Sequence, residues 1–110
     1  MIRVNRTYTR KSVAVPWHTE QPYVNYIYDE EFKENVRTKY GNTLHYLSNI
    51  ESDDGLTLNF ESLWESMEDF QQYLNDPICC KAWERRDEHN NLYLINSEPS
   101  VITTVTHGTI

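Results

Sequence analysis

Histidine is the first residue type to consider, because imidazole binds metals and transfers protons near neutral pH. The chain has four, His18, His45, His89 and His107. A local metal site needs two ligands about three to five residues apart, and no two histidines are that close. We therefore expect no metal site. His89 stands near the predicted end of a helix, where the helix dipole favours a cation, and His107 stands in the C-terminal tail.

The two cysteines, Cys79 and Cys80, are adjacent in the sequence. Neighbouring cysteines form a disulfide only by distorting the peptide between them, so free thiols in a reducing compartment are expected. A thiol nucleophile needs a base beside it. His89 follows the two thiols by ten and nine residues, and neither offset places it next to a thiol on one helix. We predict structural, buried cysteines.

Glycine and the acidic residues exclude further kinds of site. Glycine occurs only at positions 41, 55 and 108, whereas dinucleotide-binding loops, P-loops and the nucleophile turn of serine hydrolases need clustered glycines. The acidic runs at 29–31 and 53–54 lack the alternating oxygen ligands of a calcium loop. We interpret both runs as solvated helix and turn positions.

Length and charge limit the organisation and the partners. A chain of 110 residues is long enough for one modest core, and we predict a single domain over residues 1–110. The net charge of −7 makes nucleic acids and anionic membranes poor partners. No apolar run approaches the roughly 18 residues of a membrane span, and the N-terminus is unlike a signal peptide. A soluble, cytoplasmic protein is expected, although a place in a virion or complex fits equally well.

Periodicity predicts the elements of the first half of the chain. Residues 2–8 alternate between apolar and polar, which indicates a half-buried strand, with Arg6 as an exception on the apolar side. Residues 9–19 are predicted to form a loop. Apolar residues then recur at helical steps from 19 to 40, which favours a helix ending at Gly41. A strand at Val24–Tyr28 is the alternative, because that segment is rich in strand formers.

Turn and capping residues mark the second half. Residues 43–52 and 56–62 predict a β-hairpin, in which Gly55 adopts the positive φ of a tight turn. A helix begins at Ser66, whose hydroxyl caps the first turn together with Asp69. Asp76-Pro77 starts a second helical segment. Residues 92–95 and 101–106 are strand-like.

This order predicts an α+β fold of the ferredoxin-like βαββαβ type. Four antiparallel strands form the sheet, and the helices cover one face of it. The extra C-terminal strand after Pro99 either extends an edge or crosses to another subunit, and an exposed edge favours a homodimer. The sheet face away from the helices is polar, which suits either solvent or a hydrated interface between sheets. It is predicted to carry Arg3, Asn5, Thr7, His45, Leu47, Asn49, Thr57, Asn59 and Glu61.

The order of elements resembles that of the dimeric α+β barrel superfamily, which includes the antibiotic biosynthesis monooxygenases. The likeness is strongest over residues 60–77, FESLWESMEDFQQYLNDP, where a strand leads into a helix that breaks at Asn75-Asp76-Pro77. The resemblance implies two sheets packed face to face across a dimer, with a pocket between each sheet and its helices. Members include cofactor-independent oxygenases, haem-degrading enzymes and proteins that only bind ligands. The whole chain also resembles small proteins of marine microbes and their phages.

The resemblance to haem-degrading members of that superfamily implies a haem site built from a strand asparagine, a helix tryptophan and a helix histidine. Asn5, Trp64, Trp83 and His89 are the residues of these types here. The spacing from Trp83 to His89 departs from the family pattern, so we expect no haem and no other cofactor.

Aromatic residues are numerous: 3 Trp, 8 Tyr and 3 Phe. Most fill the core, but Tyr and Trp also gather where a cavity is half apolar and half wet. We predict a pocket between helices and sheet for an apolar or amphipathic ligand, fatty-acid-like or aromatic, whose carboxylate would meet Arg86. The alternative is that the same side chains pack together and leave no cavity. The predicted ligand-binding residues are Trp17, His18, Tyr23, Ile27, Leu58, Phe60, Phe70, Trp83 and Arg86.

These patterns predict a homodimeric domain that binds a small molecule. One alternative is a cofactor-independent monooxygenase of the antibiotic biosynthesis type, acting on an aromatic or quinone-like substrate. Another is a component of a phage or other complex whose role is assembly only. No catalytic residue is assigned by the sequence.

Overall fold

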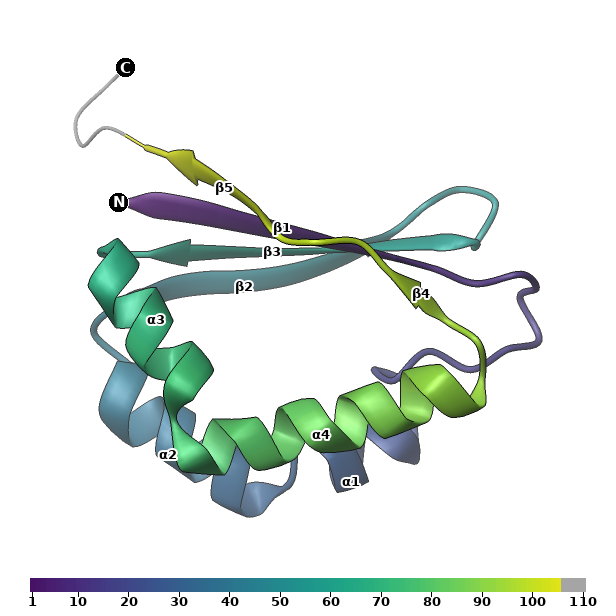
Figure 1. Ribbon diagram of the computed structural model, residues 1–110, viewed down its shortest axis with the longest axis horizontal. Coiled ribbons are helices and arrows are strands. Elements are labelled where there is room, and N and C mark those ends of the chain that lie inside the picture. The colour runs from purple at the N-terminus through teal and green to yellow at the C-terminus, as the bar shows by residue number, and fades with distance from the viewer. Residues whose placement is uncertain (106–110) are drawn as a thin grey trace.

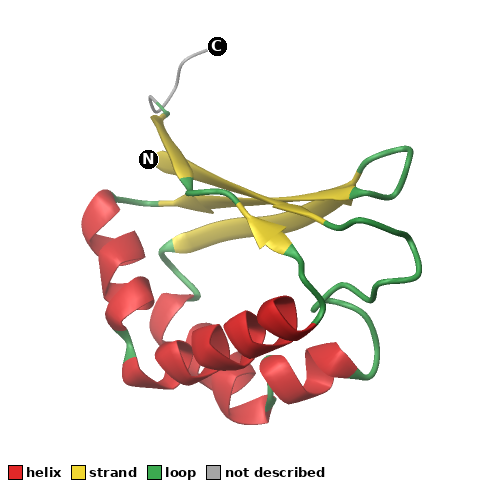
Figure 2. Cartoon of the chain, turned by 45° about the vertical axis from the view of Figure 1, so that its right-hand side comes forward, coloured by secondary structure: helices red, strands yellow, loops and turns green. Residues whose placement is uncertain are grey.

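The computed structural model describes residues 1–105 and confirms the predicted α+β fold, with helices on one face of an antiparallel sheet (Figures 1 and 2). Thr106, the last residue of the predicted terminal strand, lies outside the described residues, as do Gly108 and His107. The elements are β1 (Ile2–Thr9), α1 (Tyr23–Ile27), α2 (Glu30–Tyr40), β2 (Leu44–Glu51), β3 (Thr57–Trp64), α3 (Met67–Asn75), α4 (Pro77–Leu92), β4 (Asn96–Ser97) and β5 (Val101–Thr104).

The strand order is β2-β3-β1-β4, and β5 also pairs with β1. β4 lies against Tyr8 and Thr9, whereas β5 lies against residues 2–5 of the same strand. The two short strands therefore divide one edge of β1 between them and together take the place of the fourth ferredoxin-like strand. The C-terminal strand extends the edge of its own sheet, which is one of the two predicted arrangements (Figure 1).

The predicted strand at 92–95 is wrong, because α4 continues to Leu92. The backbone N–H groups of Tyr93 and Ile95 donate to the carbonyls of His89 and Asn90 at the end of the helix. These N–H groups are therefore not free to form hydrogen bonds with a neighbouring strand. Leu94 then takes a positive φ of 57° and turns the chain. Within residues 92–98, the strand pairing with β1 is limited to Asn96 and Ser97.

The predicted helix over 19–40 is divided into α1 and α2. Tyr28 leaves the helical conformation, and Asp29 starts a new helix by accepting a hydrogen bond of 3.0 Å from the N–H of Phe32. A capping aspartate satisfies donors that would otherwise lack partners, which favours a new helix start. Residues 23–27 are helical, so the alternative strand does not form. α2 ends at Tyr40, before Gly41, as expected.

The β-hairpin is confirmed, with Gly55 at φ +74° in its turn. A register shift between Leu44 and Tyr46 reverses the faces of β2, however. Leu47 and Asn49 lie opposite residues 62 and 60 on the helix side, and not on the far side with His45 as predicted. A bulge adds one residue to a strand and thereby exchanges its inner and outer positions.

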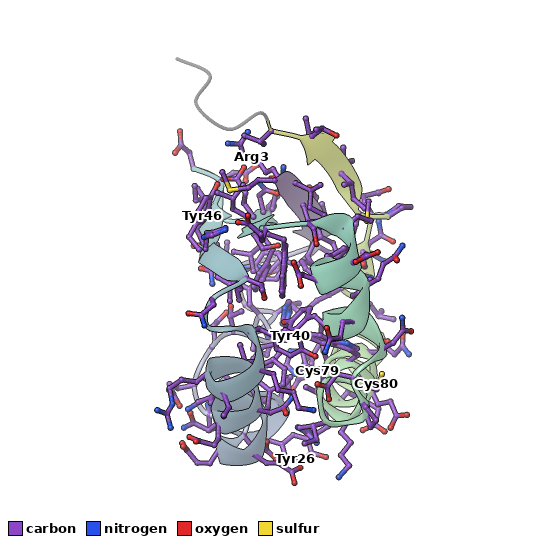
Figure 3. All side chains as sticks on the ribbon, turned by 90° about the vertical axis from the view of Figure 1, so that its left-hand side faces the viewer. Arg3, Tyr26, Tyr40, Tyr46, Cys79 and Cys80 are labelled. Atoms are coloured by element: carbon purple, nitrogen blue, oxygen red, sulfur yellow. The ribbon has the colours of Figure 1, made fainter. Side chains whose placement is uncertain are left out.

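Two apolar clusters fill the space between the layers. The larger contains Ile2, Val4, Tyr40, Trp64, Phe70 and Cys79, and the smaller contains Tyr8, Trp17, Leu58 and Ile95. Burial raises the pKa of the Cys79 thiol to about 12, so this thiol stays protonated and structural. Cys80 is half-buried on the outer side of α4 (Figure 3). Both thiols are free.

Candidate ligand-binding site

A cavity of about 330 Å³ lies between the sheet and the helices, and we call it the interlayer cavity. Its volume is at the lower end of the range of ligand pockets, about 300–1,000 Å³. The sheet contributes Val4, Arg6, Tyr8, Leu47, Asn49, Phe60 and Ser62. The helices and the segment between them contribute Val24, Tyr28, Phe32, Phe70, Tyr73, Leu74, Trp83 and Arg86.

The helical wall is held in place by contacts between aromatic rings. The ring centroid of Trp83 lies 5.6 Å from that of Phe32 and 5.1 Å from that of Tyr73, both edge-to-face. Such pairs add about 0.5–1.5 kcal/mol beyond their buried area, which fixes the shape of the wall. Burial raises the pKa of Tyr28 and Tyr73, so both phenols are neutral.

The interlayer cavity is open to solvent between β2 and α3. Leu47 of β2 and Leu74 of α3 both line it and are 56% and 42% exposed. Tyr8 and Phe70, by contrast, are buried. An apolar ligand would therefore enter between apolar side chains and reach aromatic ones.

Two arginines bring charge to this apolar space. Arg86 of α4 is 12% exposed along its side chain, and its guanidinium carbon lies 5.0 Å from the centre of the Trp83 ring. Arg6 of β1 lies over Tyr8 at 5.5 Å and donates two hydrogen bonds, of 3.0 and 2.7 Å, to the hydroxyl of Ser97.

His18 lies directly behind the aromatic wall. It is fully buried, and its ring contacts Tyr8, Tyr28 and Phe60, which all line the interlayer cavity. Neither ring nitrogen has a hydrogen-bond partner in the part of the chain that the structure describes. Burial lowers the pKa of His18 to about 3, and the positive charge of Arg86 contributes to this shift. The imidazole is therefore neutral at physiological pH.

The structure gathers only part of the predicted ligand-binding set. Four of its nine residues, Phe60, Phe70, Trp83 and Arg86, line the interlayer cavity, and His18 contacts the cavity rings from behind. Trp17 and Leu58 line a separate polar hollow beside the hairpin, and Tyr23 and Ile27 line a third hollow between α1 and α4. Trp17 and Tyr23 thus lie outside the interlayer cavity and apart from each other.

Arg10 explains why Trp17 lies outside the interlayer cavity. The guanidinium donates to the carbonyls of Val15 and Gly55, forms ion pairs with Glu20 and Glu51, and lies 4.4 Å from the Trp17 ring centre. The Trp17 indole N–H also donates to Glu51 over 2.9 Å. These bonds hold the loop after β1 against the hairpin, and its side chains fill the smaller core.

Sequence reasoning missed several residues of the interlayer cavity. Tyr28, Phe32 and Tyr73 had helical spacing, but spacing alone does not distinguish cavity from core. Leu47 was assigned to the wrong face because of the bulge. Arg6 carried a usable signal, since a charged residue on the apolar side of a strand needs a polar space to occupy.

The residues considered for haem do not form one site. Trp83 lines the interlayer cavity, whereas Trp64 is fully buried in the larger core. Asn5 pairs with Glu61 and Val101, one position out of phase with the cavity-lining Val4. The Nε2 of His89 donates a hydrogen bond of 2.9 Å to the carbonyl of Pro16. Side chains on opposite faces of a sheet cannot meet one haem.

Residues 1–105 contain no cluster of three or more side chains suited to hold a metal ion. In the same part of the chain no helix combines the length and the apolar character needed to cross a membrane.

Several solved structures are similar to this chain. A proposed antibiotic biosynthesis monooxygenase from Deinococcus radiodurans has a TM-score of 0.64 and 9% identity, over 100% of this chain and 97% of that one. SnoaB, a cofactor-independent oxygenase from Streptomyces nogalater, has a TM-score of 0.59 and 11% identity, over 96% of this chain and 93% of that one. A Mycobacterium tuberculosis protein has a TM-score of 0.55 and 12% identity, over 99% of this chain and 100% of that one.

These similarities confirm the resemblance seen in the sequence at the level of the fold. The chain has the ferredoxin-like α+β fold of antibiotic biosynthesis monooxygenase-like proteins. Neither a family model nor a curated protein matches its sequence. Because one fold hosts many activities, function has to be argued from the interlayer cavity.

Proposed function

We propose that this protein is a homodimeric, single-domain binder of a small apolar or amphipathic molecule, which occupies the interlayer cavity. The observation that carries the proposal is the combination of an aromatic wall with a nearly buried arginine, Arg86, in a cavity of ligand size. Ligand pockets characteristically pair a mostly apolar lining with few polar groups that fix orientation. A fatty-acid-like or aromatic molecule fits this lining, because each buried methylene contributes about 0.8 kcal/mol.

Titration of tryptophan fluorescence tests the proposal, since Trp83 lies in the wall. Decanol and decanoate are the probes, and we expect at least one to bind with a Kd below about 100 µM, equivalent to more than about 5 kcal/mol. The variant Val24→Phe places a larger side chain in the cavity and should abolish binding. Leu92→Phe, at an exposed position of α4, is the matched control. Absence of binding to the wild-type protein would refute the proposal and leave a role in assembly only.

The homodimer is supported by the sheet face that the helices leave uncovered (Figure 2). Tyr46, Ile50 and Val101 lie on that face by strand register, and all three are exposed. Arg3 and Glu61 form an ion pair of 3.5 Å there, and the Tyr46 hydroxyl donates to Glu61. Figure 3 places Arg3 and Tyr46 at the end of the molecule opposite α2 and α4. A second sheet would cover these apolar groups and keep the ordered polar ones hydrated.

Cofactor-independent oxygenation of an aromatic substrate is the second candidate. It is favoured by the fold shared with SnoaB, which is such an oxygenase, and by the aromatic wall. It ranks second because His18, with a pKa of about 3, is a poor base for deprotonating a phenol. Oxygen consumption with a panel of phenols tests it. No consumption above the rate without protein would exclude oxygenation and leave ligand binding as the function.

A further inference from the structure

We propose that the ligand of the interlayer cavity is an organic anion, and that its acidic group is held by Arg6 and Arg86. This inference rests on the proposed function and specifies the class of ligand. It starts from the charges around the cavity, which are opposite in sign to the charge of the whole protein, −7.

Among residues 1–105, the charged side chains that line the cavity are Arg6, Glu61 and Arg86. Glu61 pairs with Asn5 and Ser48 in the strand register, which places it on the outer face of the sheet. There its carboxylate is occupied by Arg3 and Tyr46. The two guanidiniums are therefore the ionic groups that remain for a molecule between the layers.

Both guanidiniums have bonding capacity left. Arg6 donates to the neutral hydroxyl of Ser97 and has no ion pair within residues 1–105. Among residues 1–105, Arg86 has one carboxylate partner, its sequence neighbour Asp87, which is 59% exposed and binds Nε at 3.2 Å. A guanidinium carries five N–H donors and prefers two parallel bonds to a carboxylate. Each arginine can thus accommodate an anion without losing a strong partner.

A third donor lies in the same wall. The indole N–H of Trp83 is buried and has no hydrogen-bond partner within the described chain. A buried donor without a partner is destabilising, and an acceptor from a ligand would relieve this. The lowered pKa of His18, which is due first to burial, agrees with the geometry, because the positive charges of Arg86 and Arg6 add to the shift. Donors and positive charge together favour an oxyanion over a neutral or cationic head group.

The test compares three molecules of equal chain length, namely decanoate, decanol and decylammonium, at pH 7.5. We expect decanoate to bind at least tenfold more tightly than the other two. The global charge of −7 works against this order, so a preference for the anion must arise locally. Equal affinities for decanoate and decanol would overturn the inference and leave the proposed function intact. Failure of all three to bind would refute both.

Arginine variants locate the acidic end. Arg86→Gln and Arg6→Gln should each weaken decanoate at least tenfold and change decanol less than twofold. Arg37→Gln removes an exposed arginine of α2 and should change neither, so it controls for net charge. A second readout uses wild-type protein only: at pH 7.5, decanoate should shift the side-chain NMR resonances of Arg6 and Arg86, whereas decanol should not. Unchanged arginine resonances with bound decanoate would place the anion elsewhere and overturn the inference.

Discussion

The imidazole of His18 stacks on the phenyl ring of Phe60, with ring centroids 5.5 Å apart and planes inclined by 18°. This contact joins the loop after β1 to the centre of β3, and it places a titratable group where water does not reach it. Because the folded state holds His18 neutral, protonation of this histidine occurs mainly in the unfolded chain.

His18 should therefore make the protein less stable as the pH falls. Its pKa is about 3 in the folded protein against an ordinary value of 6.5, so the unfolded state binds the extra proton below pH 6.5. Between pH 7 and pH 5 this histidine alone should remove about 2 kcal/mol of unfolding free energy. In His18→Phe, which keeps a stacking ring, that part of the pH dependence should disappear. Urea denaturation at both pH values measures it, and identical losses in the two proteins would contradict the prediction.

Asp76 should affect the stability of the protein in a more acidic pH range than His18. Its side chain is buried, caps α4, and accepts hydrogen bonds from Asn35 and Tyr40 at 3.0 and 2.7 Å. These hydrogen bonds, opposed by burial, hold the pKa of Asp76 well below its usual value. Asp76→Asn should destabilise the protein by about 2–4 kcal/mol at pH 7. Because the carboxylate stabilises only while ionised, the difference should shrink as the pH falls below about 4.

The variant Tyr40→Phe measures the contribution of the tyrosine hydroxyl separately from that of the Asp76 carboxylate. It removes one donor and keeps the ring in the larger core, so the loss should be about 1 kcal/mol. Thermal unfolding of both variants at pH 7 and pH 3 measures these values. A deficit of Asp76→Asn that stays constant between the two pH values would contradict the assigned role of the carboxylate.

Arg10 should determine how firmly the loop after β1 is held. Arg10→Met removes its bonds to two carbonyls and two carboxylates, and we expect a loss of about 2–4 kcal/mol. Trypsin cleavage after the exposed Lys11 should become at least tenfold faster, as read by mass spectrometry. Arg37→Met, at a solvent-exposed position of α2, is the control and should cleave at the wild-type rate. Unchanged cleavage in Arg10→Met would mean that other contacts hold the loop.

The uncovered sheet face should mediate dimerisation. Ile50, on that face and 66% exposed, would be buried by a second sheet, so Ile50→Lys should place a charge in the interface. Light scattering at micromolar concentration should give a mass of about twice 13.1 kDa for the wild-type protein and a smaller mass for the variant. Leu92→Lys, at an exposed position of α4, should leave the dimer intact. A monomeric wild-type protein would contradict the homodimer outright.

Local interactions made several elements predictable. Ser66 and Asp76 each begin a helix because an oxygen of the side chain accepts from a backbone N–H two or three residues further on. Gly55 sets the hairpin turn because it tolerates a positive φ. These effects involve neighbours in the chain, so the sequence alone determines them, and with them the order of elements that defines the fold.

Contacts between distant segments decided the rest. The bulge in β2 appears only when β2 pairs with β3, yet it determines that Leu47 lines the cavity. The position of the Trp17 ring depends on Arg10, seven residues before it, and on Glu51, 34 residues after it. Arg6 and Arg86 are 80 residues apart, and only the packing of α4 on the sheet brings both to one cavity. The sequence alone therefore determined the order of the main elements, whereas the fourth strand, the faces of β2 and the charged cavity depend on groups that meet only after folding.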